Sequence, residues 1–178
     1  MLPHETAKDK RYVYRGKIIN VRRDEVVFPN GNESSREVVE HRGAVAVAAV
    51  DSEGYIYLVR QFRYAFGEEL LEIPAGKLEE GEESAHLEAA IRELREETGL
   101  KADEMDYLGV IYPSVGMLTE RIYLYLARGL TQGEMDLDED EFLNVERIPV
   151  GELEKMARRG EIRDAKTLCA LFLIQDKI

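Results

Sequence analysis

The sequence is poor in cysteine and tryptophan: its 178 residues include one Cys and no Trp. The single thiol, Cys169, cannot form an internal disulfide, and its apolar helical surroundings indicate a buried side chain. A chain of this kind fits a reducing cytoplasm. Long apolar runs are also missing, since residues 44–50 are far too few to cross a bilayer and the N-terminus has no apolar signal core. We therefore expect a soluble, cytoplasmic protein with no membrane partner.

Basic residues are in deficit, with 24 Lys and Arg against 36 Asp and Glu and a net charge of −12. This charge opposes nonspecific binding to nucleic acid or to an anionic membrane, so neither is expected as a partner. The stretch from Gly76 to Gly81 lacks the Lys-Ser/Thr of a P-loop, and no HExxH or CxxC motif occurs. The length fits one domain with a small appendage. An anionic substrate would need a metal ion and local arginines.

Three glutamates give the clearest chemical signal. Glu93, Glu96 and Glu97 stand at i, i+3 and i+4, which places them on one side of a helix. The opposite stripe carries four residues that we predict to face the core: Leu87, Ile91, Leu94 and Thr98. Like charges at this spacing weaken an isolated helix by roughly 0.2–0.5 kcal/mol per pair, which a divalent cation would offset. Oxygen ligands without a nearby His or Cys favour Mg²⁺ or Mn²⁺, and Mg²⁺ commonly also binds substrate phosphates.

A solvated surface is the simpler interpretation of three glutamates taken alone. The flanking residues favour a site instead. Residues 70–73 are typical of a strand, Pro74-Ala75-Gly76 breaks that strand, and Gly99 can end the helix as a C′ glycine. Strand, glycine loop, acidic helix and glycine stop form one unit. We therefore predict a site for a divalent cation and a substrate that contains phosphate.

This unit resembles the box of the Nudix hydrolase family, G-x5-E-x7-R-E-U-x-E-E-x-G-U, in which U is a bulky aliphatic residue. Residues 92–100, RELREETGL, match without a gap, and Gly76 and Glu82 have the family's spacing. Nine residues rather than seven separate Glu82 from Arg92. Ser84 is a candidate N-cap, so we expect the loop and the first helical turn to absorb the two extra residues without rotating the acidic face.

Strand and turn signals divide the chain into two parts. Residues 12–21, 25–28 and 36–41 are typical of strands and predict a small β appendage over residues 1–42. The apolar stretch GAVAVAAV opens the second part, residues 43–178, as a buried strand. Further strands are predicted at 55–60, 107–112 and 121–127, and helices at 151–159 and after the cap Asp164. The Nudix resemblance implies an α+β fold, an α/β/α sandwich with a mixed sheet.

Segments outside the box resemble the ADP-ribose pyrophosphatase branch of the family. The resemblance covers nearly the whole chain, and five segments carry it: YRGKII at 14–19, VEHRGAV at 39–45, VRQFRY at 59–64, LEIPAG at 71–76 and GEIRDAKT at 160–167. One segment departs. The branch usually has Ser-Pro-Gly before a Glu, whereas this chain has Ser114-Val115-Gly116 and then Glu120.

The resemblance implies a role for each box residue. Glu93 and Glu97 would bind metal, helped by Glu96 and by the backbone carbonyl of Ala75. Glu82, which lies before the two-residue insertion, would be a further carboxylate of the metal site. Arg92 would orient the carboxylates. More than one Mg²⁺ or Mn²⁺ ion per site is implied. Together the ions would neutralise a diphosphate and activate water.

Residues outside the box would hold the substrate and supply a base. Arg63 and Arg42 could clamp phosphate oxygens bidentately, or either could serve only an ion pair. Gly116 and Glu120 correspond to the Gly and the Glu of the branch's Ser-Pro-Gly segment, and would also contact the substrate. In this branch the base comes from an acidic loop after the last sheet strand, here residues 136–141, in which Glu141 matches best and Glu139 next.

The expected activity is Mg²⁺-dependent hydrolysis of ADP-ribose to AMP and ribose 5-phosphate, with other nucleoside diphosphate sugars as weaker substrates. Two alternatives stay open. The same chemistry could act on NADH or a diadenosine polyphosphate, or the chain could sense ADP-ribose without cleaving it if the insertion misplaces the site. The resemblance also implies a homodimer, because the N-terminal β region of such enzymes exchanges between subunits and helps to form the adenine pocket.

Overall fold

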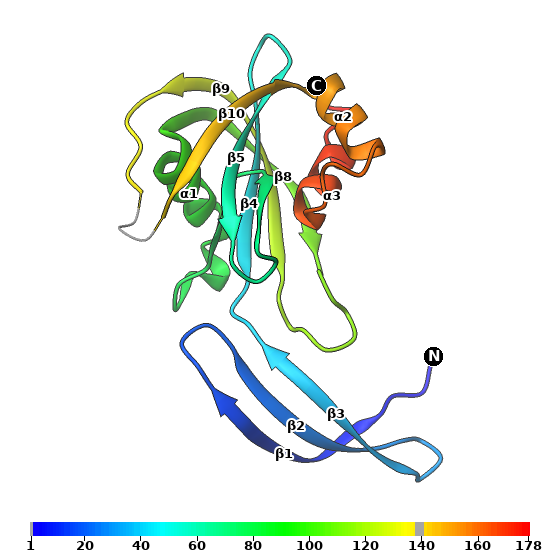
Figure 1. Cartoon of the computed structure of the whole chain (residues 1–178). Coiled ribbons are helices and arrows are strands. Elements are labelled where there is room, and N and C mark those ends of the chain that lie inside the picture. Colours follow the sequence, from blue (N-terminus) through cyan, green and yellow to red (C-terminus); the bar gives the residue numbers. More distant parts are fainter. Residues whose placement is uncertain (1, 138–140) are drawn as a thin grey trace.

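The N-terminal residues form a separate three-stranded antiparallel sheet. The computed structural model describes residues 2–137 and 141–178, apart from the side chain of Glu83. The strands are β1 (Thr6–Arg15), β2 (Asn20–Val27) and β3 (Glu33–Glu40), in the order β1-β2-β3. Figure 1 shows this sheet below the main body. It is joined to the main body where the Val39 N–H donates to the Met117 carbonyl and the Thr119 N–H to the Val39 carbonyl.

The continuous strand predicted over residues 12–21 is wrong. β1 ends at Arg15, and β2 begins at Asn20. A tight turn joins them, because the Gly16 N–H donates to the Ile19 carbonyl at 2.9 Å. An alternating apolar pattern cannot distinguish one long strand from a hairpin whose turn contains a single glycine.

The second sheet is mixed. Its order is β10-β5-β4-β9-β8, with β6 paired to β5 and β7 paired to β4. The strand bounds are β4 (Ala44–Val50), β5 (Tyr55–Arg63), β6 (Glu68–Glu72), β7 (Ala75–Lys77), β8 (Leu100–Ile111), β9 (Ile122–Gln132) and β10 (Leu143–Pro149). β4 runs parallel to β9 and antiparallel to β5 and β7. Every residue of β4 is buried, which explains its uninterrupted apolar sequence.

Helices cover both faces of this sheet. α1 (His86–Thr98) lies on one face, and α2 (Val150–Arg158) and α3 (Ala165–Leu173) lie on the other (Figure 1). Two cores result: Val45, Val47 and Ala49 of β4 pack on the α1 side, whereas the alternate residues of β4 pack on the α2 and α3 side. The predicted α/β/α sandwich with a mixed sheet and an N-terminal β appendage is therefore confirmed. Among the described residues, none of the helices has the length and apolar character needed to cross a membrane.

The ends of the helices follow local chemistry. Gly99 ends α1 with a φ of 72°, as predicted. Asp164 caps α3 by accepting a hydrogen bond from the Thr167 N–H at 3.0 Å, which confirms the predicted cap. Two strands were not predicted: β7, which lies where a glycine loop was expected, and β10. The acidic segment 136–141 does not follow the last sheet strand, because β10 comes after it and pairs with β5 at the edge of the sheet.

Candidate functional site

The buried face of α1 agrees with the prediction at Leu94 and Thr98, which are 1% and 2% exposed, and differs from it at Leu87 and Ile91. Leu87 and Ile91 are 37% and 49% exposed, whereas Glu93 and Glu97 are only 8% and 3% exposed. The prediction assumed that aliphatic side chains face the core and carboxylates face water. Instead, the small side chains of Ala89 and Ala90 let the helix approach the sheet closely, so the neighbouring glutamates are enclosed. The alanine pair is the sequence signal that could have indicated this orientation.

The start of β7 encloses the two buried carboxylates. The Ala75 N–H donates to Oε2 of Glu97 at 2.9 Å. A Cβ on Gly76 would lie 1.9 Å from the carboxyl carbon of Glu93. The glycine of the box is therefore needed for space, because any side chain there would occupy the position of the Glu93 carboxylate.

A Gly76→Ala substitution tests this close approach. We expect the methyl group to displace Glu93 or the backbone of β7, to lower stability by about 1–3 kcal/mol and to weaken Mg²⁺ binding at least about tenfold. Calorimetry with Mg²⁺ and thermal unfolding measure the two effects. Gly151→Ala is the matched control, since a Cβ there meets nothing within 4 Å. Unaltered Mg²⁺ affinity in Gly76→Ala would show that Glu93 does not need this position.

Burial strongly perturbs both carboxylates. Loss of water raises the pKa of Glu93 to about 7, and the charges of Glu96 and Glu141 add to the rise while Arg92 opposes it. Burial raises the pKa of Glu97 to about 8, with further contributions from Glu93 and Glu141 and opposition from the Ala75 N–H and Arg63. Glu141 thus lies close enough to act electrostatically on both. The cluster has more negative charge than its own cations neutralise.

Arg92 gathers the remaining carboxylates of the box. Its Nη1 donates to Glu93 at 2.8 Å and to Glu96 at 3.0 Å, and its Nη2 lies 3.4 Å from Glu82. Within residues 2–137 and 141–178, no group of three or more His, Cys, Asp or Glu side chains is arranged as a ready metal site. The carboxylates are directed to Arg92 and Ala75 instead of converging on one point.

The two extra residues of the box are absorbed ahead of α1. Glu82–Ser84 forms a short 3-10 helix, and Glu82 accepts from the Glu79 N–H at 2.8 Å while it still reaches Arg92. Ser84 is not the N-cap, so that prediction is wrong: Ala85 occupies the cap position without a side-chain hydrogen bond. The His86 ring stacks on Tyr123 with centroids 4.1 Å apart and hydrogen-bonds Tyr125, which anchors the first turn without a cap.

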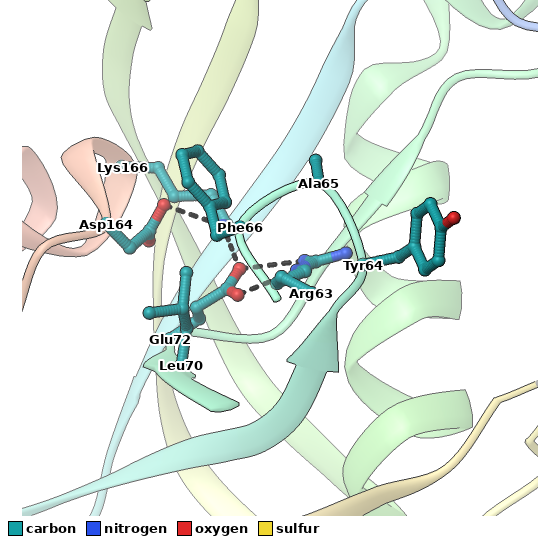
Figure 2. Close-up of a pocket in the computed structure, with 8 residues that line it drawn as sticks. All are labelled: Arg63, Tyr64, Ala65, Phe66, Leu70, Glu72, Asp164 and Lys166. Carbon is teal, nitrogen blue, oxygen red and sulfur yellow. Dashed lines mark hydrogen bonds and ion pairs between the residues drawn. The ribbon is translucent and has the colours of Figure 1, made fainter. Parts of the chain in front are cut away.

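Arg63 lies beside the carboxylate cluster and is already paired. Its Nε and Nη2 donate to the two oxygens of Glu72 at 2.7 Å each, and its charge acts on Glu97. Arg63 and Glu72 border a cavity of about 420 Å³ whose wall also includes Lys166, Asp164, Tyr64 and Phe66 (Figure 2). The sequence analysis did not identify Glu72, which pairs with Arg63, or Lys166, which pairs with Glu72. Both residues fall in segments that resemble the branch, LEIPAG and GEIRDAKT.

The other predicted substrate residues lie elsewhere in the described structure. Arg42 is exposed, with Nη2 3.6 Å from Glu80. Glu120 lies 3.3 Å from Nδ1 of His41, and Gly116 is in the loop between β8 and β9, which extends toward the N-terminal sheet (Figure 1). The described contacts do not bring these three residues to Glu93 and Glu97. Glu139 lies outside the described residues.

The donor chemistry of the cluster fits a hard divalent cation. Glu93 and Glu97 are two buried carboxylates that repel each other, and the backbone of Ala75 adjoins them. A cation would stabilise both charges in this enclosed place.

Mg²⁺ is expected to stabilise the protein more as the pH rises. In the metal-free protein the pKa values of Glu93 and Glu97 both exceed the ordinary 4.5. The protonated forms of these two groups therefore contribute fully to stability below about pH 4.5, and this contribution is lost as the pH rises through 7 and 8. Mg²⁺ must displace the protons, so its apparent affinity should increase by up to about tenfold per pH unit for each proton displaced. Thermal unfolding with Mg²⁺ or chelator between pH 6 and pH 8.5 measures the difference. A constant Mg²⁺ effect would contradict the buried carboxylates as ligands.

Comparisons with known proteins agree with this geometry. Residues 40–171 match the NUDIX domain, and residues 5–39 match the nucleoside diphosphate sugar hydrolase N-terminal domain. The chain is 41% identical over 170 residues to "ADP-ribose pyrophosphatase" of Bacillus subtilis (strain 168), covering 94% of this chain and 91% of that protein. It is 39% identical over 165 residues to "Methanol dehydrogenase activator" of Bacillus methanolicus, covering 92% and 88%.

A solved structure described as "ADP compounds hydrolase" supports the fold. It superposes with a TM-score of 0.84 at 23% identity and covers 99% of this chain and 95% of that chain. The matched NUDIX domain covers more than half of the chain and contains the whole cluster from Arg63 to Glu141. The chain therefore belongs to the Nudix hydrolase family, on the branch that includes the ADP-ribose pyrophosphatases.

Proposed function

We propose that this enzyme hydrolyses the diphosphate bond of ADP-ribose to AMP and ribose 5-phosphate with Mg²⁺, and other nucleoside diphosphate sugars more slowly. The observation that carries the proposal is the buried pair Glu93 and Glu97 beside Ala75, with Arg63 at the edge of the same cluster. A nucleoside diphosphate sugar has a diphosphate that the cations would bind and a sugar that the cavity beside Arg63 would hold. The matches to both halves of a nucleoside diphosphate sugar hydrolase support this substrate class.

Glu93 and Glu97, with the carbonyl of Ala75, are the proposed ligands of more than one Mg²⁺ ion, for which Mn²⁺ can substitute. Glu96 and Glu82 would complete the set, and Arg92 keeps the carboxylates oriented through its hydrogen bonds to three of them. When bound, such ions offset the diphosphate charge and lower the pKa of water.

Arg63 is the proposed clamp for the substrate phosphates. Its Nε and Nη2 are held by Glu72, so its Nη1 edge can donate to a phosphate oxygen. Arg42, Gly116 and Glu120 lie toward the N-terminal sheet and would contact the substrate only from that side, where a second subunit can contribute.

Glu141 is the proposed general base, with Glu139 as the second candidate. Its charge contributes to the raised pKa of Glu93 and of Glu97, so it lies within electrostatic reach of the cluster. Its carboxylate would take a proton from the attacking water. As the water oxygen bonds to phosphorus, the bridging phosphorus–oxygen bond breaks and releases AMP and ribose 5-phosphate.

Residues 1–42 are the proposed dimerisation element, and residues 43–178 the catalytic domain. All residues of β1 are exposed, including Tyr12, Val13 and Tyr14. A three-stranded sheet with one wholly exposed strand needs further contacts for stability. A second copy of the chain in the cytoplasm would supply them. Sedimentation should give the mass of a homodimer, and a monomeric mass would refute this part of the proposal.

A panel of substrates tests the activity. The purified protein is incubated with ADP-ribose, NADH, a diadenosine polyphosphate and sugar nucleotides, with Mg²⁺ or chelator, and the products are identified. AMP and ribose 5-phosphate from ADP-ribose, formed only with Mg²⁺, is the expected result. Faster cleavage of NADH or the diadenosine compound would reassign the substrate. Tight ADP-ribose binding without turnover would identify a sensor.

A further inference from the structure

Arg63 is part of an ion-pair network with Glu72, Lys166 and Asp164. Its centre is Glu72, which is 2% exposed and holds both Nε and Nη2 of Arg63 at 2.7 Å. Figure 2 shows these groups at the wall of the cavity, with Lys166 and Asp164 on the opposite side of the Glu72 carboxylate. The pKa of Glu72 is lowered because Arg63 and Lys166 outweigh the effect of burial, so this buried carboxylate is charged.

Lys166 connects this carboxylate to α3. Its side chain is largely buried, and its ammonium donates to Oε2 of Glu72 and, at 2.9 Å, to Oδ1 of Asp164. Asp164 is itself fixed as the N-cap of α3 by the Thr167 N–H. The four charged groups sum to zero, so the cavity does not attract an additional anion by net charge.

The same turn of α3 also holds the backbone that leads to the carboxylate cluster. The Thr167 hydroxyl accepts a hydrogen bond from the Ile73 N–H at 2.9 Å, in a buried position. Ile73 is two residues before Ala75, whose N–H binds Glu97. The first turn of α3 therefore contacts both Glu72 and the connection that leads into β7 at Ala75.

We infer that Lys166 is a positioning residue that orients Arg63 toward the substrate diphosphate by acting through Glu72. This inference rests on the proposed function of Arg63. Lys166 supplies part of the positive charge that Glu72 requires, and it fixes one carboxylate oxygen to α3. Glu72 then holds the Nε and Nη2 edge of the guanidinium in one orientation, while Nη1 stays available for phosphate. Without Lys166, Glu72 would depend on Arg63 alone and the pair would be free to rotate together.

A double-mutant cycle tests this coupling by steady-state kinetics. Lys166→Met should lower kcat/KM about 10- to 100-fold, mainly through KM, and Lys166→Arg should restore most of it. In an Arg63→Met background, Lys166→Met should have little further effect, because both changes remove the same interaction. Arg163→Met is the matched control, since Arg163 is exposed and pairs only with Glu68 among the described residues. Additive losses, or equal losses in Lys166→Met and Lys166→Arg, would overturn the inference.

A spectroscopic readout separates this inference from the proposed activity. The Arg63 Nε–H signal in proton–nitrogen NMR spectra, assigned by its loss in Arg63→Met, reports on the bidentate pair directly. Lys166→Met should shift and broaden this signal, and Arg163→Met should leave it unchanged. If the wild-type protein hydrolyses no compound of the panel, the proposed function fails, yet this signal still tests the contact. An unchanged Arg63 signal in Lys166→Met would refute the positioning role.

Discussion

Replacing Glu97 by Gln is expected to abolish most of the hydrolysis, with kcat reduced by more than the roughly 100-fold typical of residues that only support metal ligands. The amide cannot supply the negative charge that a hard cation requires. The same change should preserve the fold, since the Gln oxygen can still accept from the Ala75 N–H. The substitution also removes a buried carboxylate whose pKa is raised to about 8. In the presence of chelator, the variant should therefore unfold at the wild-type temperature or higher.

Two measurements distinguish loss of metal from loss of structure. The increase in unfolding temperature that Mg²⁺ produces in the wild type should be absent from Glu97→Gln. Glu88→Gln, an exposed position on the same helix, should keep both this increase and the activity. A Glu97→Gln protein that retains full turnover would remove Glu97 from the proposed site, whatever its stability.

Replacing Glu141 by Gln should lower kcat by about 10²- to 10⁴-fold, the usual contribution of a positioned general base. KM and the stabilisation by Mg²⁺ should change far less, because Glu141 is proposed to act on water. The loss of its charge should also reduce the repulsion that raises the pKa values of Glu93 and Glu97. Pre-steady-state product formation at saturating ADP-ribose measures the chemical step.

The neighbouring acids provide the comparison. Glu134→Gln changes an exposed carboxylate of the preceding segment and should leave kcat unaltered. If Glu141→Gln is fully active while Glu139→Gln loses the same factor, the base is Glu139. Activity in both single variants would contradict a base from this segment.

Local signals in the sequence predicted α1 and its surroundings correctly in outline. Gly99, Asp164 and the uninterrupted apolar strand β4 each depend on near neighbours in the chain, so their structures could be inferred from composition and spacing. The burial of Glu93 and Glu97 on α1 could not be inferred in this way. A helix with glutamates on one side and Leu87 and Ile91 on the other is expected to bury the aliphatic side. Here, Ala75 and Gly76 of β7 pack against the glutamates instead.

Long-range contacts set the rest of the site. Glu72 and Lys166 are 94 residues apart in the sequence, and neither belongs to the box. The pairing of β10 with β5 at the sheet edge was equally hidden, because its residues Leu143–Pro149 are only partly buried and contain two charged side chains. A pattern of apolar residues predicts which side of a single helix or strand is buried. It does not predict which charged residues of distant elements come into contact.

The ion pair between Lys166 of α3 and Glu72 of β6 has a consequence for folding during synthesis. During synthesis Glu72 leaves the ribosome 94 residues ahead of Lys166. Burial of the Glu72 carboxylate is costly until its second cation, Lys166, is available, so we expect the region around Arg63 to remain hydrated until α3 has emerged. Arg63 is therefore expected to acquire its final orientation only in the last stage of folding.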